Sequence, residues 1–284
     1  MSVEPKSLTW EDAVVWLRNQ PDRRQLVIDA YFDDPLLAAA KRYHESGEWR
    51  EIAALLRGRT GKALDVGAGR GIASYALARE GFAVTSLEPD PSAIVGSAAI
   101  RSLAAEAALP IEVVEETSER LPFADGEFDM VFARAVLHHT SDLDRACAEM
   151  YRVLRRDGIL IAVREHVISR ESDLQDFLDD HPLHHLYGGE KAFVLDRYLG
   201  ALRGAGFAPV EVLSPLQSPI NLFPYTIDTL REAVVERASQ KLPGRSFWRI
   251  ALGSDRIFAA LLSLASRFDN RPGRLYSFIA HKAA

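Results

Sequence analysis

Two acidic residues and a glycine-rich segment are the features of the sequence best suited to bind a ligand. Asp65 lies inside a short apolar run, Glu88 follows a second one, and Gly67-Ala68-Gly69-Arg70-Gly71 stands between them. Glycines at this spacing let the backbone turn tightly and let a ligand approach it closely. A carboxylate repels a pyrophosphate and attracts an ammonium group, and one after a second strand can bind two ribose hydroxyls. The predicted ligand therefore contains a ribose and a cationic group and lacks a phosphate.

The spacing of these glycines also separates one class of cofactor from another. The pattern is G-x-G-x-G, whereas the fingerprint of dinucleotide-binding proteins is G-x-G-x-x-G. Together with the acid at position 65, this spacing disfavours a nicotinamide-dependent oxidoreductase, and a titration with NADH would test that alternative. A tight turn that binds no ligand is the other interpretation of the glycines alone.

Histidines follow two of the predicted strands and could remove a proton. His138 and His139 come after one strand, and His166 comes shortly after another. Ligands bind at the carboxyl ends of the strands in an open α/β sheet, so these side chains can face one crevice. A hydroxyl group must lose its proton to become a good nucleophile, and a histidine with a pKa near neutrality suits that step. We predict His166 as the general base and His138 as the second candidate.

A further group of histidines lies in residues 181–190, which read His-Pro-Leu-His-His-Leu-Tyr-Gly-Gly-Glu. Histidine is a common metal ligand and Glu190 supplies oxygen, but the spacing matches no standard zinc site. We therefore predict no metal and interpret the segment as a lid loop hinged at Gly188-Gly189. Residues 166–190 and 214–273 are expected to close over an acceptor pocket.

These side chains need a sheet that brings the strand ends together. Short apolar runs separated by stretches of helical spacing predict alternating strands and helices, and hence a parallel sheet covered on both faces. The predicted strands are residues 63–66, 83–87, 111–114, 128–133, 159–163, 209–213 and 275–281. The predicted helices of this part are residues 72–79, 90–107, 144–154 and 193–205, the second beginning at Asp90-Pro91.

The chain is predicted to divide into three regions. Residues 1–57 are helical, with a capping signal at Thr9 and Asp12. Residues 58–213 with 274–284 form the α/β core, and residues 214–273 form a helical cap inserted before the last strand. From Leu213 to Arg274 the chain carries nine Lys+Arg against five Asp+Glu, so the cap could meet an anionic acceptor or simply be a solvated face. Its candidate apolar walls are Phe223, Tyr225, Phe247 and Trp248.

Composition excludes several classes of protein. The 284 residues include 34 Lys+Arg and 40 Asp+Glu, a net charge of −6, which argues against a nucleic-acid partner because such partners usually need a basic domain. The single cysteine, Cys147, excludes an intramolecular disulfide framework. No signal-like start and no apolar segment of membrane-spanning length is visible, so the sequence predicts a cytoplasmic protein without a membrane partner. No oligomeric state is predicted.

Five motifs follow one another in residues 50–165. They are Leu64–Gly71 followed by Glu88, Ser118–Phe123, Phe128–Phe132, Ala135–His139, and Tyr151–Leu154 before Asp157-Gly158. With these motifs in this order, the segment resembles the class I S-adenosylmethionine-dependent methyltransferases, of the small-molecule, methyltransferase-11-like type. The resemblance implies a Rossmann-like seven-stranded sheet, mostly parallel with the last strand antiparallel. It also implies an enzyme that uses S-adenosyl-L-methionine.

The resemblance assigns roles to residues of the cofactor half. The methionine ammonium would be held by Asp65 and the glycine loop, and the ribose hydroxyls by the acid after the second strand. The residues so assigned are Asp65, Gly67, Ala68, Gly69, Gly71, Glu88 and Pro89. Thr117 and Ser118 fall where the family contacts the adenine edge, although Thr replaces the usual acid at 117. Ala133 and Arg134 would line the methionine tail, with a surface salt bridge as the alternative for Arg134.

The predicted reaction is methylation of a small-molecule acceptor, with a hydroxyl favoured over nitrogen or carbon. A non-catalytic module that binds S-adenosylmethionine or S-adenosylhomocysteine is the rival from another class. A structural role is the alternative to base catalysis for the histidines, because a His-His pair after the fourth strand is often structural in this family. Glu165 could simply pair with Arg164 or with an arginine of residues 214–273.

Overall fold

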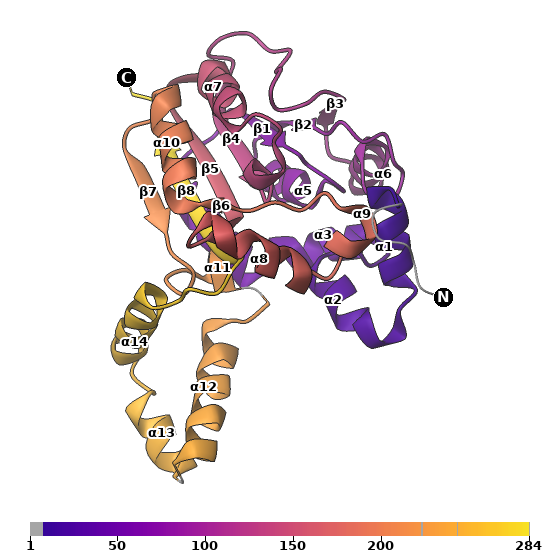
Figure 1. Ribbon diagram of the computed structural model, residues 1–284. Helices are drawn as coiled ribbons and strands as arrows, with labels where there is room; N and C mark the ends of the chain where they lie inside the picture. Colours follow the sequence, from indigo (N-terminus) through magenta and orange to yellow (C-terminus); the bar gives the residue numbers. More distant parts are fainter. Residues whose placement is uncertain (1–7, 223, 243, 284) are drawn as a thin grey trace.

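One mixed sheet runs through the centre of the computed structural model, which describes residues 8–222, 224–242 and 244–283 (Figure 1). In that part of the chain the strands are β1 (Lys62–Val66), β2 (Ala83–Leu87), β3 (Ile111–Val114), β4 (Phe128–Arg134), β5 (Leu154–Ile168), β6 (Phe193–Val194), β7 (Val210–Leu213) and β8 (Arg274–His281). The strand order is β3-β2-β1-β4-β5-β8-β7, and β6 pairs with β5 outside this path. Strand β8 is antiparallel to β5 and β7, and the remaining pairs are parallel. The predicted Rossmann-like sheet is therefore confirmed, and β6 is a short strand that the sequence did not reveal.

Helices cover both faces of this sheet and extend beyond it. The α-helices of the described residues are α1 (Trp10–Arg18), α2 (Arg24–Asp29), α3 (Leu36–His44), α4 (Gly47–Leu55), α5 (Ile72–Arg79), α6 (Ser97–Ala107), α7 (Leu143–Val153), α8 (Leu174–Asp180), α9 (His184–Tyr187), α10 (Leu195–Ala205), α11 (Pro219–Leu222), α12 (Ile227–Lys241), α13 (Arg245–Ala251) and α14 (Asp255–Arg267). Short 3₁₀ segments are η1 (Pro21–Arg23), η2 (Leu137–His139) and η3 (Glu171–Asp173). Among these helices we find none whose length and apolar character would let it cross a membrane.

Local sequence signals explain where several helices begin. Thr9 caps α1 in a reciprocal capping box with Asp12, as predicted. The start of α6 differs from the prediction, because the helix begins at Ser97 and not at the Asp90-Pro91 pair. The Asp90 carboxylate accepts the Ser92 N–H, and the Asp90 carbonyl accepts the Ser97 N–H at 2.7 Å. These bonds close a turn ahead of the helix, so Asp90 organises the loop before α6 and not the first turn of α6 itself.

The core consists of two apolar layers, one on each face of the sheet. Successive residues of a strand point to opposite faces, so Val131 packs in the layer with α7 and α10. Its neighbour Phe132 packs in the layer that contains Trp49 and Ile52 of α4. Each fully buried side chain of this size contributes about 1.5–3 kcal/mol. This burial holds the strand ends rigidly enough to position a site.

The N-terminal helices divide between the sheet and its carboxyl edge. Helices α3 and α4 belong to the layer that covers one face of the sheet, as part of the predicted helical region. Helix α1 packs against the segment around α9 through Ala13, Leu17, Leu183 and Leu186. The Leu8 N–H also donates to the Leu186 carbonyl at 3.2 Å. Two segments far apart in sequence therefore form one layer beside the strand ends.

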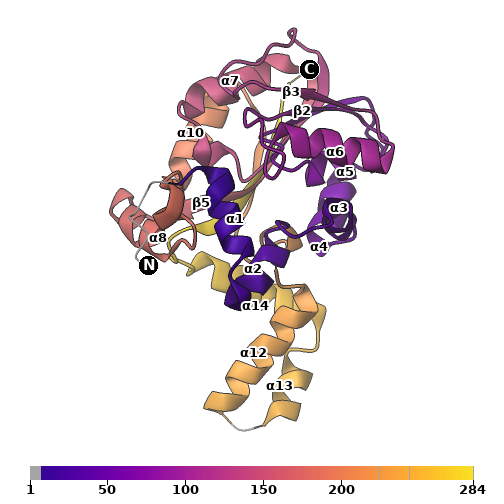
Figure 2. The ribbon, with the colours of Figure 1, turned by 90° about the vertical axis from the view of Figure 1, so that its right-hand side faces the viewer.

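Helices α12, α13 and α14, which we call the helical arm, leave the body of the protein after α11. Figure 2 shows α12 and α13 extending well away from the sheet. The arm has its own small core, which includes Val235, Leu252, Phe258 and Leu262. The prediction that residues 214–273 are helical is thus correct for the described part. Phe223, one of the predicted apolar walls, lies outside the described residues.

Candidate functional site

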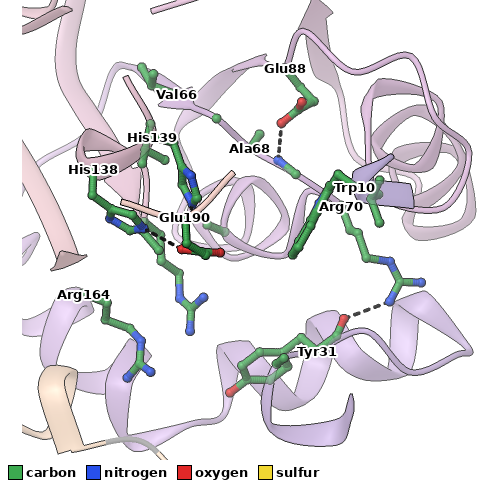
Figure 3. A pocket seen from close by; sticks show the side chains of 18 of the residues that line it. Trp10, Tyr31, Val66, Ala68, Arg70, Glu88, His138, His139, Arg164 and Glu190 are labelled. Carbon is green, nitrogen blue, oxygen red and sulfur yellow. Dashed lines mark hydrogen bonds and ion pairs between the residues drawn. The ribbon is translucent and has the colours of Figure 1, made fainter. Parts of the chain in front are cut away.

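A cavity of about 810 Å³ lies where the strands β1, β2, β4 and β5 end (Figure 3). Its lining combines the glycine loop, the ends of these strands, helices α1 and α2, and residues 181–190. None of the described residues of 214–273 lines it. The prediction that this region caps the acceptor pocket is therefore wrong for this structure, because the arm projects away from the cavity.

The glycine loop wraps one side of the cavity in a conformation that few residue types tolerate. Gly67, Gly69 and Gly71 have φ angles of 62°, 54° and 82°, in the left-handed region that glycine adopts readily. A Cβ built on Gly67 would lie 2.7 Å from Cγ2 of Val136. Gly71 does not line the cavity and instead provides the N-cap of α5, which corrects its predicted ligand contact.

Asp65 lies buried beneath the glycine loop and lines the cavity. Its carboxylate accepts the Ser74 hydroxyl at 2.5 Å, and the Ser74 oxygen is 2.7 Å from that of Ser86. Burial raises the pKa of Asp65 to about 7, because desolvation disfavours the charged form. A cationic ligand group in the cavity would stabilise that charged form.

Glu88, at the end of β2, hydrogen-bonds to the glycine loop and also lines the cavity. Its two carboxylate oxygens accept the backbone N–H of Gly69 at 2.7 Å and of Asp90 at 3.0 Å. Burial raises the pKa of Glu88 to about 7 even though these donors act in the opposite direction. Each oxygen keeps a further lone pair, so the carboxylate can still accept hydroxyl groups of a ligand.

The remaining predicted cofactor residues fall into two groups. Ala68, Pro89, Thr117 and Ser118 line the cavity, with Thr117 exposed and Ser118 buried. Ala133 does not line it, and its side chain is buried in the core instead. The reason is strand alternation, since the cavity wall formed by β4 begins at the next residue.

Arg134 lines the cavity and is held there by a buried acid. Its Nε and Nη2 atoms donate to the two oxygens of Glu48 in α4 at 2.7 and 3.1 Å. Arg164 approaches the same carboxylate at 3.8 Å. Burial by itself would raise the pKa of Glu48, yet the two arginines hold it below its usual value. The alternative given for Arg134, a surface salt bridge, is therefore wrong, because the ion pair is buried, and sequence reasoning gave no sign of Glu48.

Glu165 fixes the position of His138. Its oxygens accept the backbone N–H groups of Val136, Leu137 and His138, each at 3.1 Å, and lie 2.6 Å from Nδ1 of the His138 ring. The predicted pairing of Glu165 with Arg164 or an arginine of 214–273 is therefore wrong. The carboxylate instead closes the 3₁₀ turn η2, so the histidine ring is oriented from β5.

His166 and His138 stand side by side in the cavity wall, with ring centroids 4.8 Å apart. The Nδ1 atom of His166 lies 2.8 Å from the Gly273 carbonyl, which leaves Nε2 as the free ring nitrogen. Burial lowers the pKa of His166 to about 3, and it also lowers that of His138 well below the usual value. Both rings are thus neutral near pH 7 and have a nitrogen lone pair available.

Residues 181–190 contribute five residues to the cavity lining, of which His181 and Glu190 are ionisable groups near the histidines. His181 and Glu190 line the cavity, whereas Nε2 of His185 lies 2.9 Å from the Asp179 carbonyl outside it. The Tyr187 hydroxyl donates to Oε1 of Glu190. The segment is not entirely the loop that was predicted, because it contains the short helix α9 (His184–Tyr187), which Gly188 ends with φ of 74°.

Arg70 is a second residue that sequence reasoning missed, although it lies within the glycine motif. Its Nη1 atom donates to the carbonyls of Tyr31 and Asp33 at 2.8 and 3.0 Å, and its Nη2 pairs with Asp34 (Figure 3). The guanidinium therefore ties the glycine loop to the chain that follows α2. No local pattern announces such a contact, because its partners are mostly backbone carbonyls from a distant segment.

Comparison with known proteins shows that the chain is similar to methyltransferases. The model of the methyltransferase-domain family matches residues 64–162. The ubiquinone biosynthesis O-methyltransferase of Methylobacterium nodulans is 28% identical over 161 residues, which cover 55% of this chain and 64% of that protein. The match thus spans less than two thirds of that relative's length.

Solved structures share the fold over nearly the whole chain. A protein of Galdieria sulphuraria, proposed to be a sarcosine dimethylglycine methyltransferase, has a TM-score of 0.58 at 18% identity and covers 96% of this chain and 98% of its own. Phosphoethanolamine N-methyltransferase 2 of Haemonchus contortus, solved with S-adenosyl-L-methionine, has a TM-score of 0.56 at 19% identity. That match covers 98% of this chain and 61% of the other. One of these names refers to O-methylation and another to N-methylation, so the names do not identify the methylated atom.

Proposed function

We propose, from the premise that this chain belongs to the class I S-adenosylmethionine-dependent methyltransferases, that it methylates a hydroxyl group of a small molecule. The single observation that carries the proposal is the pair of buried carboxylates, Asp65 and Glu88, on either side of the glycine loop in one cavity. The O-methyltransferase name of a relative at 28% identity supports the choice of a hydroxyl acceptor.

The residues around the loop fit the cofactor by their chemistry. Asp65 offers a carboxylate to an ammonium group, and Glu88 offers two oxygens to vicinal hydroxyls. The absence of a Cβ at Gly69 lets a ligand approach the backbone, since a Cβ built there would have no atom closer than 3.9 Å. When bound, the cofactor supplies an electrophilic methyl group on a sulfonium. The chain's own residues bind and orient the two reactants, and orientation of this kind can supply several kcal/mol, up to about 7–11.

A hydroxyl acceptor must also lose its proton, and the proposed acceptor of that proton is an imidazole of the cavity wall. His166 and His138 each have Nδ1 beside a carbonyl or carboxylate oxygen, so each offers Nε2 to the cavity. A positioned base with a pKa near neutrality contributes about 10²–10⁴ in rate, and the lowered pKa of both rings makes each a weaker base, so the expected contribution lies at the lower end of that range. Neither ring needs to touch the cofactor.

The acceptor itself is proposed to be a small, anionic molecule. Arg134 and Arg164 line the same cavity as the histidines, and Glu48, with one negative charge, offsets only part of their positive charge. Nucleic acid is not proposed as a partner, given the net charge of −6. The proposed compartment is the cytoplasm, on the sequence grounds given above.

Calorimetric titration with S-adenosylhomocysteine tests the cofactor assignment. Asp65→Asn and Glu88→Gln should each weaken binding about 10–100-fold, because each removes a charge-assisted contact. Glu106→Gln, an exposed acid on α6, is the matched control and should bind like the wild type. Unchanged affinity in both test variants would remove the cofactor assignment.

Turnover on a panel of hydroxyl, amine and carbon acceptors then tests the reaction. His166→Ala or His138→Ala should depress hydroxyl methylation while leaving S-adenosylhomocysteine affinity near the wild-type value. Near-normal turnover in both variants would favour an acceptor that is already nucleophilic, such as an amine. Cofactor binding without turnover on any acceptor would favour the non-catalytic binding module.

A further inference from the structure

Three potential metal-ligand atoms converge in the cavity wall without a proton donor between them. The Nε2 atoms of His138 and His139 lie 3.9 and 3.8 Å from Oε2 of Glu190. Figure 3 shows the three side chains pointing toward one another, two from the turn η2 and one from the segment after α9. All three ligand atoms lie within 4.8 Å of one another.

The second nitrogen of each ring indicates which atom carries the proton. Nδ1 of His138 faces the Glu165 carboxylate at 2.6 Å, and that carboxylate already accepts three backbone N–H groups. Nδ1 of His139 lies 3.3 Å from the Gly189 carbonyl, which can only accept. The proton of each neutral ring is therefore assigned to Nδ1, and each Nε2 presents a lone pair to Glu190.

Glu190 presents a lone pair in return. Its side chain is 5% exposed, and Oε2 is buried without a hydrogen-bond partner among the described residues, while Oε1 accepts the Tyr187 hydroxyl. A buried, unpaired carboxylate oxygen is costly. A proton on one ring nitrogen would not satisfy it, because an N–H···O bond spans about 2.7–3.2 Å and these separations are longer.

A metal cation would satisfy all three atoms at once. Tetrahedral coordination with bonds of about 2.0–2.2 Å separates two ligand atoms by about 3.3–3.6 Å. The observed 3.8 and 3.9 Å exceed that by only a few tenths of an ångström. Two histidines and one carboxylate leave a coordination position open, as in catalytic zinc sites and iron(II) oxygenase sites.

We propose that His138, His139 and Glu190 bind one divalent transition-metal ion, of which Zn²⁺ is the probe of choice. Glu165, Gly189 and Tyr187 act as the outer partners that orient these ligands, an arrangement typical of metal sites. His181 stands on the other side of the carboxylate, with Nε2 at 3.7 Å from Oε1 of Glu190.

All three ligand residues line the cavity, so an acceptor bound in the cavity could reach the ion. If the proposed function holds, a hydroxyl of the acceptor coordinates the ion, which makes its proton easier to remove. The O–H bond breaks, and the proton passes to Nε2 of His166 beside the site. The oxygen then forms its bond to the methyl carbon as the carbon–sulfur bond breaks, and the electron pair stays on sulfur. His138 is then a ligand, and His166 alone remains as the base.

The direct test is metal binding by the full chain in the absence of cofactor and acceptor. After treatment with a chelator, calorimetry with Zn²⁺ should show one ion per chain, and Co²⁺ should give the visible absorption of a bound, low-symmetry site. Glu190→Gln and His139→Ala should each weaken Zn²⁺ binding at least 10-fold. His185→Ala, whose ring nitrogen meets the Asp179 carbonyl outside the cavity, should bind Zn²⁺ like the wild type.

S-adenosylhomocysteine affinity serves as the check that each variant is folded, and it should stay near the wild-type value in every variant. His139 is 39% exposed, so its loss should leave the core intact even where Glu190→Gln unfolds the segment. No Zn²⁺ binding by the wild type, or equal binding by wild type and His139→Ala, would overturn the metal site. Zn²⁺ binding with no S-adenosylhomocysteine binding would leave the metal site standing and overturn the proposed function instead.

Discussion

Asp65 and Glu88 share an unusual ionisation for the same physical reason. Each is buried at the cavity, and burial raises the pKa of each to about 7. Below that pH the ligand-free protein holds both as neutral acids, which cannot form charge-assisted contacts. We therefore expect S-adenosylmethionine affinity to fall as the pH drops from 8 to 6, by about tenfold per unit for each acid below its pKa.

Calorimetry across that pH range measures this dependence directly. Asp65→Asn should bind more weakly at pH 8 and show a shallower decline toward pH 6, because one titrating group is gone. Glu106→Gln should follow the wild-type curve. A wild-type affinity that does not change with pH would mean that neither carboxylate binds the ligand in its charged form.

At the residue scale, the sequence predicted which residues lie near the cavity better than it predicted which side chains face the cavity. The acids at 65 and 88 reach the cavity as expected, although their contacts with the cofactor stay predictions. Ala133 and Arg134 are adjacent on one strand, so only one of them can face the cavity, and the motif alone does not show which. Glu48 joins the site through tertiary packing, for which the local sequence carries no signal, and the sequence did not show that Glu190 would meet His138 and His139.

At the element scale, the junction between β5 and η2 depends on one carboxylate. Glu165→Gln removes a negative charge and one of two acceptor oxygens facing four N–H donors. Each buried donor left unpaired costs about 1–3 kcal/mol. We expect the free energy of unfolding to fall by roughly 3 kcal/mol, measured by urea titration. Glu119→Gln, at a more exposed carboxylate that accepts the Ser141 N–H, should lose less because water replaces its bonds.

Arg70 makes a second link between elements, from the glycine loop to the chain after α2. Arg70→Ala leaves the carbonyls of Tyr31 and Asp33 without this donor. We expect faster hydrogen exchange in residues 10–34, with exchange in β1 and β4 unchanged. Arg79→Ala, on the exposed end of α5, is the control. Equal exchange in both variants would show that packing alone holds α1 and α2 in place.

Most elements could be read from the sequence because strands and helices carry periodic apolar patterns. Strands β2 and β3 have the predicted bounds, and β5 extends beyond its predicted range at both ends. The closure of residues 166–190 over an acceptor stays a prediction. The polar composition of these residues concealed α8 and α9, and α9 is held by contacts with α1. Such contacts join distant segments and leave no local period.

For the whole molecule, the helical arm should be separable from cofactor binding. Phe258→Ala removes a buried side chain from the core of the arm, which should lower the stability of the arm by about 3–5 kcal/mol. Hydrogen exchange in α12–α14 should therefore become faster. S-adenosylhomocysteine affinity should stay within about twofold, since the described arm residues do not line the cavity. Ile250→Ala, which alters an exposed side chain of the same arm, should change neither quantity. A tenfold loss of affinity in Phe258→Ala would show that the arm does reach the cavity.

The place of β8 in the sheet has a consequence for how the protein is made. Strand β8 lies between β5 and β7, yet it follows both of them and the whole arm in the chain. At ordinary translation rates the edge of β5 stays unpaired for several seconds after β5 has emerged. An unpaired strand edge can pair with other strands, and β7, which has already been made, can compete with β8 for the edge of β5. Folding on the ribosome must therefore wait for the strand that also brings the Gly273 carbonyl to His166.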